Sequence, residues 1–409
     1  MTSKTAMGPA TVVVVLTLLL GVQPITTDLY LPALPTLTRE LQASMSSAQL
    51  TLSVLMICFG IGQLVCGPLA DRFGRRPVLL VGLSLYTLAS ALSAAAPSMG
   101  WLVLWRALQG AAMAAAVTGG RSIVRDLYAP HDGARVMSRA LTGLGFIAMM
   151  SPLLGGLAVQ WMNWHAALAV PAVFGALALW VISARFEETA PQLNPTATQL
   201  APILRNWAGV LRDRCFQAWV TLSAFTYGGL FFTLAGSSFV FIEVLGTSRV
   251  AYGAFLFSSS VAYVAGTFLC RRLLLARGLR GAVAVGGGLS LAGGLSMAAL
   301  SLAGVHSVWA IALPQWLYAL GHGIHQPCGQ AGAVGPFPEK AGTAASLSGF
   351  AMTLSAFAVS WWLGRHLDGT VYPLTLGIGA FSVGVAVTAW TLVQWHGDPY
   401  AHHHHPKPA

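Results

Sequence analysis

The stretch ATVVVVLTLLLGVQPITTDLYL, residues 10–31, is almost wholly apolar and carries one charged residue, Asp28. A helix that spans the hydrocarbon core of a bilayer needs about 20 mostly apolar residues. The stretch is long enough and apolar enough to do so, and we expect it to cross a membrane. The charge of Asp28 then falls where a spanning helix should still be in hydrocarbon, and its role has to be explained.

The rest of the chain has the same apolar character. Of its 409 residues, 56% are hydrophobic and 8% are charged, whereas a soluble domain carries roughly 25% charged residues. Because backbone polar groups in hydrocarbon must be paired within each segment, we expect an all-α integral membrane protein with twelve transmembrane helices. The apolar runs lie near residues 11–31, 48–68, 77–96, 101–121, 138–160, 164–185, 216–242, 251–270, 282–303, 308–332, 343–364 and 373–395.

One long polar stretch, at 186–215, interrupts the series of runs and is rich in proline and threonine. It predicts an N-terminal six-helix bundle at 1–185, a cytoplasmic linker at 186–215 and a C-terminal six-helix bundle at 216–395. We expect the remaining residues, 396–409, to form a disordered cytoplasmic tail. The tail contains four consecutive histidines, His402–His405, to which we assign no function.

The basic residues indicate an orientation in the membrane. The chain has 22 Lys and Arg. If the N-terminus is cytoplasmic, Arg39, Arg249 and Arg365 fall in outer loops, Arg106 falls inside a span, and the other eighteen fall in inner loops and tails. Cytoplasmic loops carry an excess of Lys and Arg, so we expect both termini in the cytoplasm. The net charge of +10 then reflects topology, and we expect no nucleic-acid partner.

No motif in the sequence predicts a cofactor. Cys58, Cys66, Cys215, Cys270 and Cys328 show neither a CxxC pair nor another ligand spacing, and cysteine in an apolar helix usually behaves as a small hydrophobic residue. Neither a Walker loop nor a dinucleotide fingerprint is present. We therefore expect no metal, no cofactor and no ATP-driven mechanism.

The loop after the second run, GPLADRFGRRPVLL at 67–80, is the most specific motif in the chain. Asp71 stands among three arginines, and we expect Gly67 and Gly74 to form turns there. Small residues let helix ends approach each other, so the charges can form a network that exists in only one conformation. Plain anchoring by basic residues is the alternative, and it explains the arginines but not the glycines or the aspartate.

This loop resembles the signature G-x-L-x-D-R-x-G-R-R of the major facilitator superfamily. TDLYLPALP at 27–35 and RALQGAAMA at 106–114 resemble the first-helix and fourth-helix signatures of drug:proton antiporters in that superfamily. RSIVRDLY at 121–128 and PFPEKAGTAASLSGF at 336–350 resemble its bicyclomycin-resistance (Bcr/CflA) branch. The similarity extends from about residue 15 to about residue 390.

The resemblance implies two six-helix bundles around a central cavity that work by alternating access. In helix five the usual G-P-x-x-G-G reads SPLLGG at 151–156. The second half has GTFLCRRLLLARGLR at 266–280 where its copy of the signature loop belongs, without the aspartate, so we expect the main cytoplasmic contact in the first half. The resemblance assigns the conformational switch to Gly67, Asp71, Arg72, Gly74, Arg75, Arg76, Pro152, Gly155 and Gly156.

Two charged residues inside spans are the candidates for proton coupling. An ionised carboxylate near the bilayer centre costs about 2.5–3.5 kcal/mol and usually faces a cavity or a partner. Asp28 is therefore either a proton-titratable group in the transport cavity or a residue that snorkels at the outer end of helix one. Arg106 either sits in the cavity and lowers the cost of the Asp28 charge, or ties helix ends together through backbone carbonyls.

Further side chains on the spans are candidates for drug binding. Aromatic residues at helical spacing are otherwise packing residues, and the two histidines of GHGIHQP at 321–327 are either hydrogen-bonded core residues or a second proton site, because histidine titrates near pH 6.5. The substrate-binding candidates are Tyr30, Gln63, Gln109, Met113, Tyr227, Phe231, Phe232, His322 and His325.

These residues together predict a multi-pass transporter of the bacterial inner membrane, monomeric, that expels small drug-like compounds in exchange for protons. Its expected partners are the drug, protons and the lipid bilayer. Two alternatives remain. One is a carrier of the same fold that moves a metabolite such as a sugar or an amino acid. The other is an intramembrane enzyme, which no serine–histidine or HExxH arrangement supports.

Overall fold

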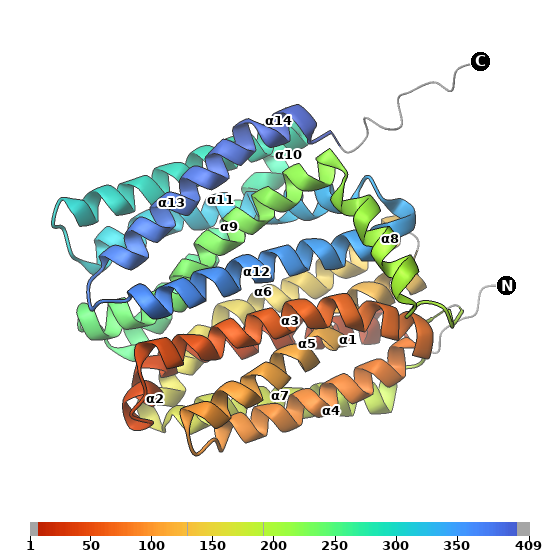
Figure 1. The fold of residues 1–409 in the computed structure, drawn as a ribbon, viewed down its shortest axis with the longest axis horizontal. Coiled ribbons are helices and arrows are strands. Elements are labelled where there is room, and N and C mark those ends of the chain that lie inside the picture. The colour runs from red at the N-terminus through yellow and green to blue at the C-terminus, as the bar shows by residue number, and fades with distance from the viewer. Residues whose placement is uncertain (1–6, 129, 191, 399–409) are drawn as a thin grey trace. The chain divides into compact units, whose positions relative to one another are not determined.

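The structure is a computed structural model that describes residues 7–128, 130–190 and 192–398. Within these ranges the chain is almost entirely helical and contains no strand (Figure 1). The predicted all-α class is therefore confirmed. Most of the predicted tail, including His402–His405, lies outside the described residues.

The chain divides into two compact units. Unit 1 holds the described residues up to Ile203 together with Arg249–Gly253. Unit 2 holds Leu204–Ser248 and the described residues from Ala254 onward. The division after Ile203 falls within the polar stretch that separates the two predicted bundles, although this stretch also contains a helix, α8 (Leu200–Leu211).

The helices follow the apolar runs of the sequence. The first seven are α1 (Pro9–Thr27), α2 (Leu34–Glu40), α3 (Met45–Phe73), α4 (Arg75–Ala94), α5 (Met99–Leu127), α6 (Pro130–Trp161) and α7 (Trp164–Arg185), with the short 3-10 helix η1 (Leu31–Ala33) between α1 and α2. After α8 (Leu200–Leu211) come α9 (Arg214–Phe239), η2 (Val240–Val244), α10 (Arg249–Leu302), α11 (Val308–Val334), η3 (Pro338–Lys340), α12 (Ala341–His366), α13 (Tyr372–Trp390) and α14 (Leu392–His396).

Ten helical stretches of the described chain are long and apolar enough to cross a membrane. One of them, α10, bends at Gly278, where φ is +67°, and its two segments correspond to the predicted runs 251–270 and 282–303. α11 has the length, at 27 residues, but Gln315, His322 and His325 make it too polar to qualify. With α10 as two segments and α11 included, the described helices match the twelve predicted spans.

Helix breaks occur at a few positions that the local sequence explains. α3 continues through Gly67 and ends at Phe73, and Gly74 adopts φ +101° between α3 and α4. A positive φ of this kind suits glycine, which has no side chain to clash with the backbone. The expected turn at Gly74 is confirmed, whereas the expected turn at Gly67 is wrong because that residue lies inside the helix.

Close helix packing in unit 1 depends on small residues of α5 and α3. A methyl group added to Gly110 would meet the carbonyl oxygen of Leu55, and one added to Gly62 would lie 2.8 Å from the carbonyl oxygen of Ala111. Small residues at such positions let the two backbones approach, which is how helices associate without a hydrophobic driving force in lipid. This packing fixes α5, and with it the side chains that α5 carries into the interior.

We predict that Gly110→Ala lowers the melting temperature of the purified protein in detergent. The added methyl group has no room against the Leu55 carbonyl, and such overpacking costs about 1–3 kcal/mol. Gly145→Ala is the matched control, because nothing lies within 4 Å of the added carbon there. Equal melting temperatures for the two variants would show that the α3–α5 contact is not tight.

Candidate functional site

Asp28 lies at a break inside a continuous membrane-spanning segment. α1 ends at Thr27, Asp28 follows as its C-cap, and the chain continues through η1 and α2 to Glu40. The apolar segment as a whole extends from Pro9 to Glu40, so Asp28 is well inside it. The side chain is half-buried, and its Oδ1 accepts a hydrogen bond of 2.6 Å from the hydroxyl of Thr27.

Arg106, on α5, is fully buried, with 0% of its surface exposed. Its Nη1 donates to Oε1 of Gln109 at 2.7 Å, and its Nη2 donates to the backbone carbonyl of Thr26 at 3.2 Å. The guanidinium also lies over the ring of Tyr30, with its carbon 4.3 Å from the ring centroid. Such a cation–π contact is worth about 2 kcal/mol when desolvated. The charge is therefore held by an amide, a carbonyl and an aromatic face.

Among the described residues, no ion pair joins Arg106 to Asp28. The guanidinium instead binds the carbonyl of Thr26, two residues before Asp28 in the chain. Arg106 thus ties α5 to the end of α1, and the position of Asp28 depends on that tie. One N–H group of the guanidinium, at Nε, is buried and makes no hydrogen bond.

The contacts of Arg106 extend into a polar core of unit 1, made of Thr26, Tyr86, Ser90, Arg106 and Gln109. Nε2 of Gln109 donates to Oγ of Ser90 at 2.7 Å. The hydroxyls of Thr26 and Tyr86 are hydrogen-bonded at 2.7 Å, and Ser90 donates to the carbonyl of Tyr86 at 2.7 Å. A change at Arg106 therefore reaches α1, α4 and α5 together.

The backbone beside Asp28 also packs closely against α6, and Tyr30 bonds to α3. A methyl group added to Gly155 of α6 would meet the carbonyl oxygen of Leu29, and Pro152 lies within the same helix. The hydroxyl of Tyr30 is hydrogen-bonded to that of Thr51 on α3 at 2.8 Å. Gly155, from the SPLLGG motif at 151–156, thus packs directly against Leu29, the residue that follows Asp28.

The drug-binding candidates of unit 1 lie inside its helix packing. Gln109 belongs to the polar core and Met113 is fully buried. Gln63 on α3 is 1% exposed, and its Nε2 has no hydrogen-bond partner. A buried amide nitrogen without a partner costs about 1–3 kcal/mol, so Gln63 is the candidate with an unused donor.

The aromatic candidates of unit 2 lie on α9 and are buried. Tyr227 and Phe231 have ring centroids 6.1 Å apart, and Phe232 packs edge-on against Trp362 and Phe381. The structure therefore places Phe232 in the core packing of unit 2.

The histidine candidates, His322 and His325, lie on α11 in unit 2 and are 2% and 0% exposed. Both approach the hydroxyl of Thr226 on α9, at 3.1 Å and 3.4 Å from their Nδ1 atoms. Cys270 and Cys328 lie in the same unit as free thiols, with sulfurs 3.5 Å apart.

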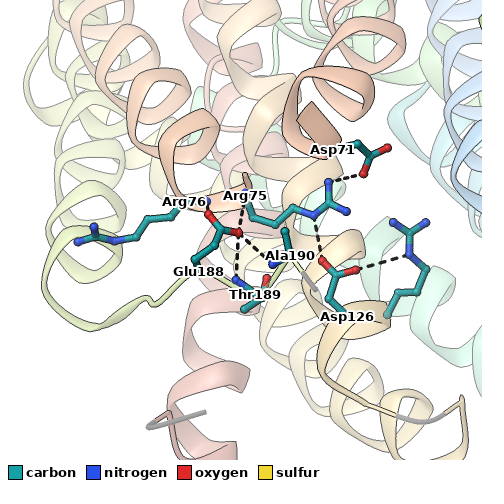
Figure 2. Close-up of polar contacts among 8 residues, drawn as sticks. Asp71, Arg75, Arg76, Asp126, Glu188, Thr189 and Ala190 are labelled. Carbon is teal, nitrogen blue, oxygen red and sulfur yellow. Dashed lines mark hydrogen bonds and ion pairs between the residues drawn. The ribbon is translucent and has the colours of Figure 1, made fainter. Parts of the chain in front are cut away.

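The loop between α3 and α4 carries a network of charges, shown in Figure 2. Arg75 is its centre: the side chain is 4% exposed and pairs with Asp71 at 2.6 Å and with Asp126 at 2.9 Å. Asp126, near the end of α5, is 5% exposed, whereas Asp71 is 45% exposed. Arg72 donates to Thr198 at 2.5 Å in the polar stretch after α7. The loop thus joins α3, α4 and α5 to that stretch.

Glu188 closes the network from the chain that follows α7 (Figure 2). Its Oε1 accepts from the backbone N–H groups of Arg75, Thr189 and Ala190 at 2.8, 3.0 and 3.0 Å, and its Oε2 accepts from that of Arg76 at 3.0 Å. Burial alone would raise the pKa of Glu188, but these four hydrogen bonds outweigh it and lower the pKa below its ordinary value. The carboxylate thereby caps the start of α4, where helix dipoles favour negative charge.

Sequence reasoning found Asp71, Arg72, Arg75 and Arg76 but did not assign Asp126 or Glu188 to the loop network. Asp126 stands in the quoted motif at 121–128, next to Arg125, to which it is paired at 3.8 Å. The sequence signal that could have identified Asp126 is that it is an isolated acid among the basic residues of a predicted inner loop.

A family model described as Major Facilitator Superfamily matches residues 16–360 of the chain. A bicyclomycin resistance protein homolog of Haemophilus influenzae is 26% identical over 90% of this chain and 92% of that protein. A chloramphenicol resistance protein of Pseudomonas aeruginosa is 28% identical over 90% of this chain and 82% of that protein. The predicted resemblance to the bicyclomycin-resistance branch is confirmed by these relatives.

An uncharacterized MFS-type transporter of Bacillus subtilis is 30% identical, over 61% of this chain and 62% of that protein. Among solved structures, a D-xylose-proton symporter superposes with a TM-score of 0.71 at 19% identity, over 94% of this chain and 97% of that one. At this identity the likeness concerns the fold alone.

We predict that Asp126→Asn destabilises the protein more than Asp71→Asn. Removing one partner of a buried ion pair costs about 3–5 kcal/mol, whereas an exposed pair contributes roughly 0–1 kcal/mol. The melting temperature of purified protein in detergent measures the difference. Maleimide labelling of Thr198→Cys reports whether the loop network has loosened. Equal losses for the two variants would contradict the central position of the Arg75–Asp126 pair.

We also predict that acid releases the segment held by Glu188. Because the folded-state pKa of Glu188 is depressed, its stabilising contribution is complete above the ordinary value of 4.5 and is lost as the pH falls through the lower folded value. Maleimides react poorly in acid, so labelling of Thr189→Cys, at a side chain that is 7% exposed, with a pH-tolerant methanethiosulfonate reagent is the measurement. Labelling should rise on acidification in an otherwise wild-type chain and should already be high at neutral pH with Glu188→Gln. Labelling that is independent of pH in both proteins would contradict the anchoring role.

Proposed function

The chain belongs to the Major Facilitator Superfamily, and from this premise we propose that it exports small drug-like compounds across a membrane in exchange for protons. The superfamily consists of transporters, and the chain is a multi-pass membrane protein. The names of the relatives, which refer to bicyclomycin and chloramphenicol resistance, favour antibiotics as the substrate class. Proton coupling and outward direction are the parts of the proposal that need experiment.

The observation that carries the proposal is the position of Asp28. A carboxyl group stands at a helix break well inside a membrane span and is half-buried; within the described chain its side-chain hydrogen-bond partner is the neighbouring hydroxyl of Thr27 alone. Ionisable residues inside spans mark ion pathways by default. A carboxyl group without a fixed countercharge can gain and lose a proton, which is the property that exchange requires.

We assign the coupling step to Asp28 and its positioning to Arg106. Drug binding is favoured when Asp28 is ionised and proton binding releases the drug, so the two ligands compete for one group. Arg106 holds the end of α1 through the carbonyl of Thr26. The loop network around Arg75 stabilises one of the two access states. Gly155 of α6 packs against the segment beside Asp28, whereas Pro152 and Gly156 pack against Arg249–Gly253 at the start of α10, and we assign all three to the conformational switch.

The remaining assignments complete the proposal. Both termini are cytoplasmic, the protein acts as a monomer in the bacterial inner membrane, and it uses neither a cofactor nor a nucleic acid. Gln63, with its unused amide donor, is the residue of unit 1 that we place against the drug. Tyr30, Gln109 and Met113 are further candidates of unit 1, and Tyr227 and Phe231 are the candidates of unit 2.

The alternative is a metabolite carrier of the same fold, and the D-xylose-proton symporter is an example of a symporter with this fold. The two functions differ in the direction of movement relative to protons. In liposomes with an acidic lumen, an antiporter accumulates its substrate inside, whereas a symporter depletes it. This result does not depend on which way the protein is inserted. Chloramphenicol is a suitable probe, because it is uncharged and does not distribute passively with pH.

We predict that Asp28→Asn abolishes this accumulation. The amide keeps the shape of the side chain but cannot bind and release a proton, so chloramphenicol should reach only the level of protein-free liposomes. Exchange of labelled for unlabelled chloramphenicol without a gradient should persist at higher chloramphenicol concentrations, because the neutral amide weakens drug binding while an uncharged drug keeps its other contacts.

Asp368→Asn is the matched control, since Asp368 is an exposed acid in the loop between α12 and α13. It should leave accumulation unchanged. Full gradient-driven accumulation by the Asp28→Asn protein would overturn the coupling assignment, and depletion by the wild type would favour symport.

A further inference from the structure

Unit 2 contains a buried pair of imidazoles that the proposed coupling through Asp28 does not use. His322 and His325 lie three residues apart on α11 and face the same hydroxyl, that of Thr226 on α9. Nε2 of His325 is also 3.2 Å from the backbone carbonyl of Val283 on α10. This imidazole pair therefore connects α9, α10 and α11.

The hydrogens available to the pair fix how it is arranged. A carbonyl oxygen only accepts, so Nε2 of His325 must carry a hydrogen toward Val283, and Nδ1 of a neutral His325 is then an acceptor. Thr226 has one hydroxyl hydrogen, which goes to that Nδ1. The contact between Thr226 and His322 is consequently made by a hydrogen on Nδ1 of His322. All three contacts are satisfied, and Nε2 of His322 is left as a bare acceptor.

The surroundings distinguish the two rings. His325 is 0% exposed, and a methyl group added to Gly286 on α10 would lie 2.7 Å from its Nε2, so this ring has no room to turn. His322 is 2% exposed, and its ring lies 5.6 Å from that of Tyr263 on α10, centroid to centroid. An aromatic face within about 6 Å attracts a cation. His322 is therefore the ring at which a positive charge has an aromatic partner.

The other titratable side chains near the pair are phenols and thiols. Tyr227 adjoins Thr226 on α9, Tyr263 and Cys270 are on the first segment of α10, and Tyr318 and Cys328 are on α11. The hydroxyl of Tyr318 donates to the carbonyl of Thr226 at 3.0 Å, which holds α11 to α9 independently of the histidines. In the described chain no carboxylate or guanidinium bonds to either ring.

We propose that Nε2 of His322 binds a second proton, in unit 2, through the relay His322–Thr226–His325. A proton that arrives at Nε2 makes His322 an imidazolium that still donates to Thr226 from Nδ1. Transfer of that Nδ1 hydrogen to Thr226, and of the Thr226 hydrogen to His325, moves the charge to His325 without breaking any contact. The proposal rests on the proposed proton-coupled export, to which it adds a second proton-binding group.

His322→Asn separates proton binding from hydrogen bonding. The amide nitrogen of asparagine is placed much as Nδ1 of histidine is, so it can still donate to Thr226, but the variant has no group at Nε2 to accept a proton. His366→Asn is the control, because His366 is exposed and bonds to the carbonyl of Trp362 within its own helix.

The first measurement needs no substrate. Nitrogen NMR of protein labelled at its histidines distinguishes a bare ring nitrogen from one that carries hydrogen, and the His322→Asn protein identifies the signals that are lost. We expect Nε2 of His322 to be bare at high pH and to gain a hydrogen as the pH falls, while Nε2 of His325 carries hydrogen throughout. A hydrogen on Nε2 of His322 at every pH, or a bare Nε2 that never titrates while the protein stays folded, would overturn the proposal.

The second measurement counts the protons that drug binding releases. Chloramphenicol is added to purified protein in detergent, and the protons released per transporter are measured with a pH-sensitive dye. The His322→Asn protein should release one proton fewer than wild type. An unchanged count would overturn the role of His322 in exchange. If wild type releases no proton at all, the coupling proposal fails, and the NMR titration still decides whether His322 binds one.

Discussion

A positive charge that is shut off from water has to be stabilised by the protein around it, and Arg106 shows how this constrains unit 1. The guanidinium is completely buried, and taking such a charge out of water costs several kcal/mol unless it is hydrogen-bonded. Its partners come from α1 and α5, and the aromatic face of Tyr30 covers it. Because one of these partners is the carbonyl of Thr26, the helix break at Asp28 is fixed in relation to α5. Arg106 therefore holds Asp28 in position, although the described structure contains no ion pair between the two side chains.

The loop network pairs the charges at the ends of α3, α4 and α5 and binds the backbone N–H groups at the start of α4. Three segments that are distant in sequence contribute acids to the turn between α3 and α4: Asp71, Asp126 and Glu188. Arg75 bridges the first two, and Glu188 binds the backbone at the start of α4. A turn with Gly74 at positive φ would otherwise leave several N–H groups without partners. The network is therefore both a helix cap and a set of ion pairs, and plain anchoring by basic residues does not account for it.

Much of this fold could be predicted from the sequence because the bilayer requires long apolar helices, and such runs are visible in one dimension. α11 is less apolar than the other spans, but its 27 residues are enough to cross a bilayer, and it was predicted as the run 308–332. The loop network was harder to predict, since Arg75 and Asp126 are 51 residues apart and Arg75 and Glu188 are 113 apart. Neither spacing carries a periodic signal. Gly67 was misjudged because a glycine followed by Pro68 suggests a turn, yet α3 continues through both residues.

The two units use related positions for different chemistry. Arg106 lies seven residues after the start of α5, and Gln315 lies seven residues after the start of α11. Three residues further on, Gln109 and Tyr318 each make a buried polar contact with another helix. In unit 1 the first position holds a permanent charge that binds a carbonyl of α1.

In unit 2 that position holds a neutral amide, whose two polar atoms are buried and have no partner, and the tie to α9 is made by the hydroxyl of Tyr318. A fixed charge in unit 1 suits a carboxyl group that must be held in place, since guanidinium stays protonated at any physiological pH. In the described part of α11 no guanidinium or ammonium group is present, and its side chains that can carry a positive charge are His322 and His325. The two units therefore differ in their buried polar chemistry because unit 1 contains the buried cation Arg106.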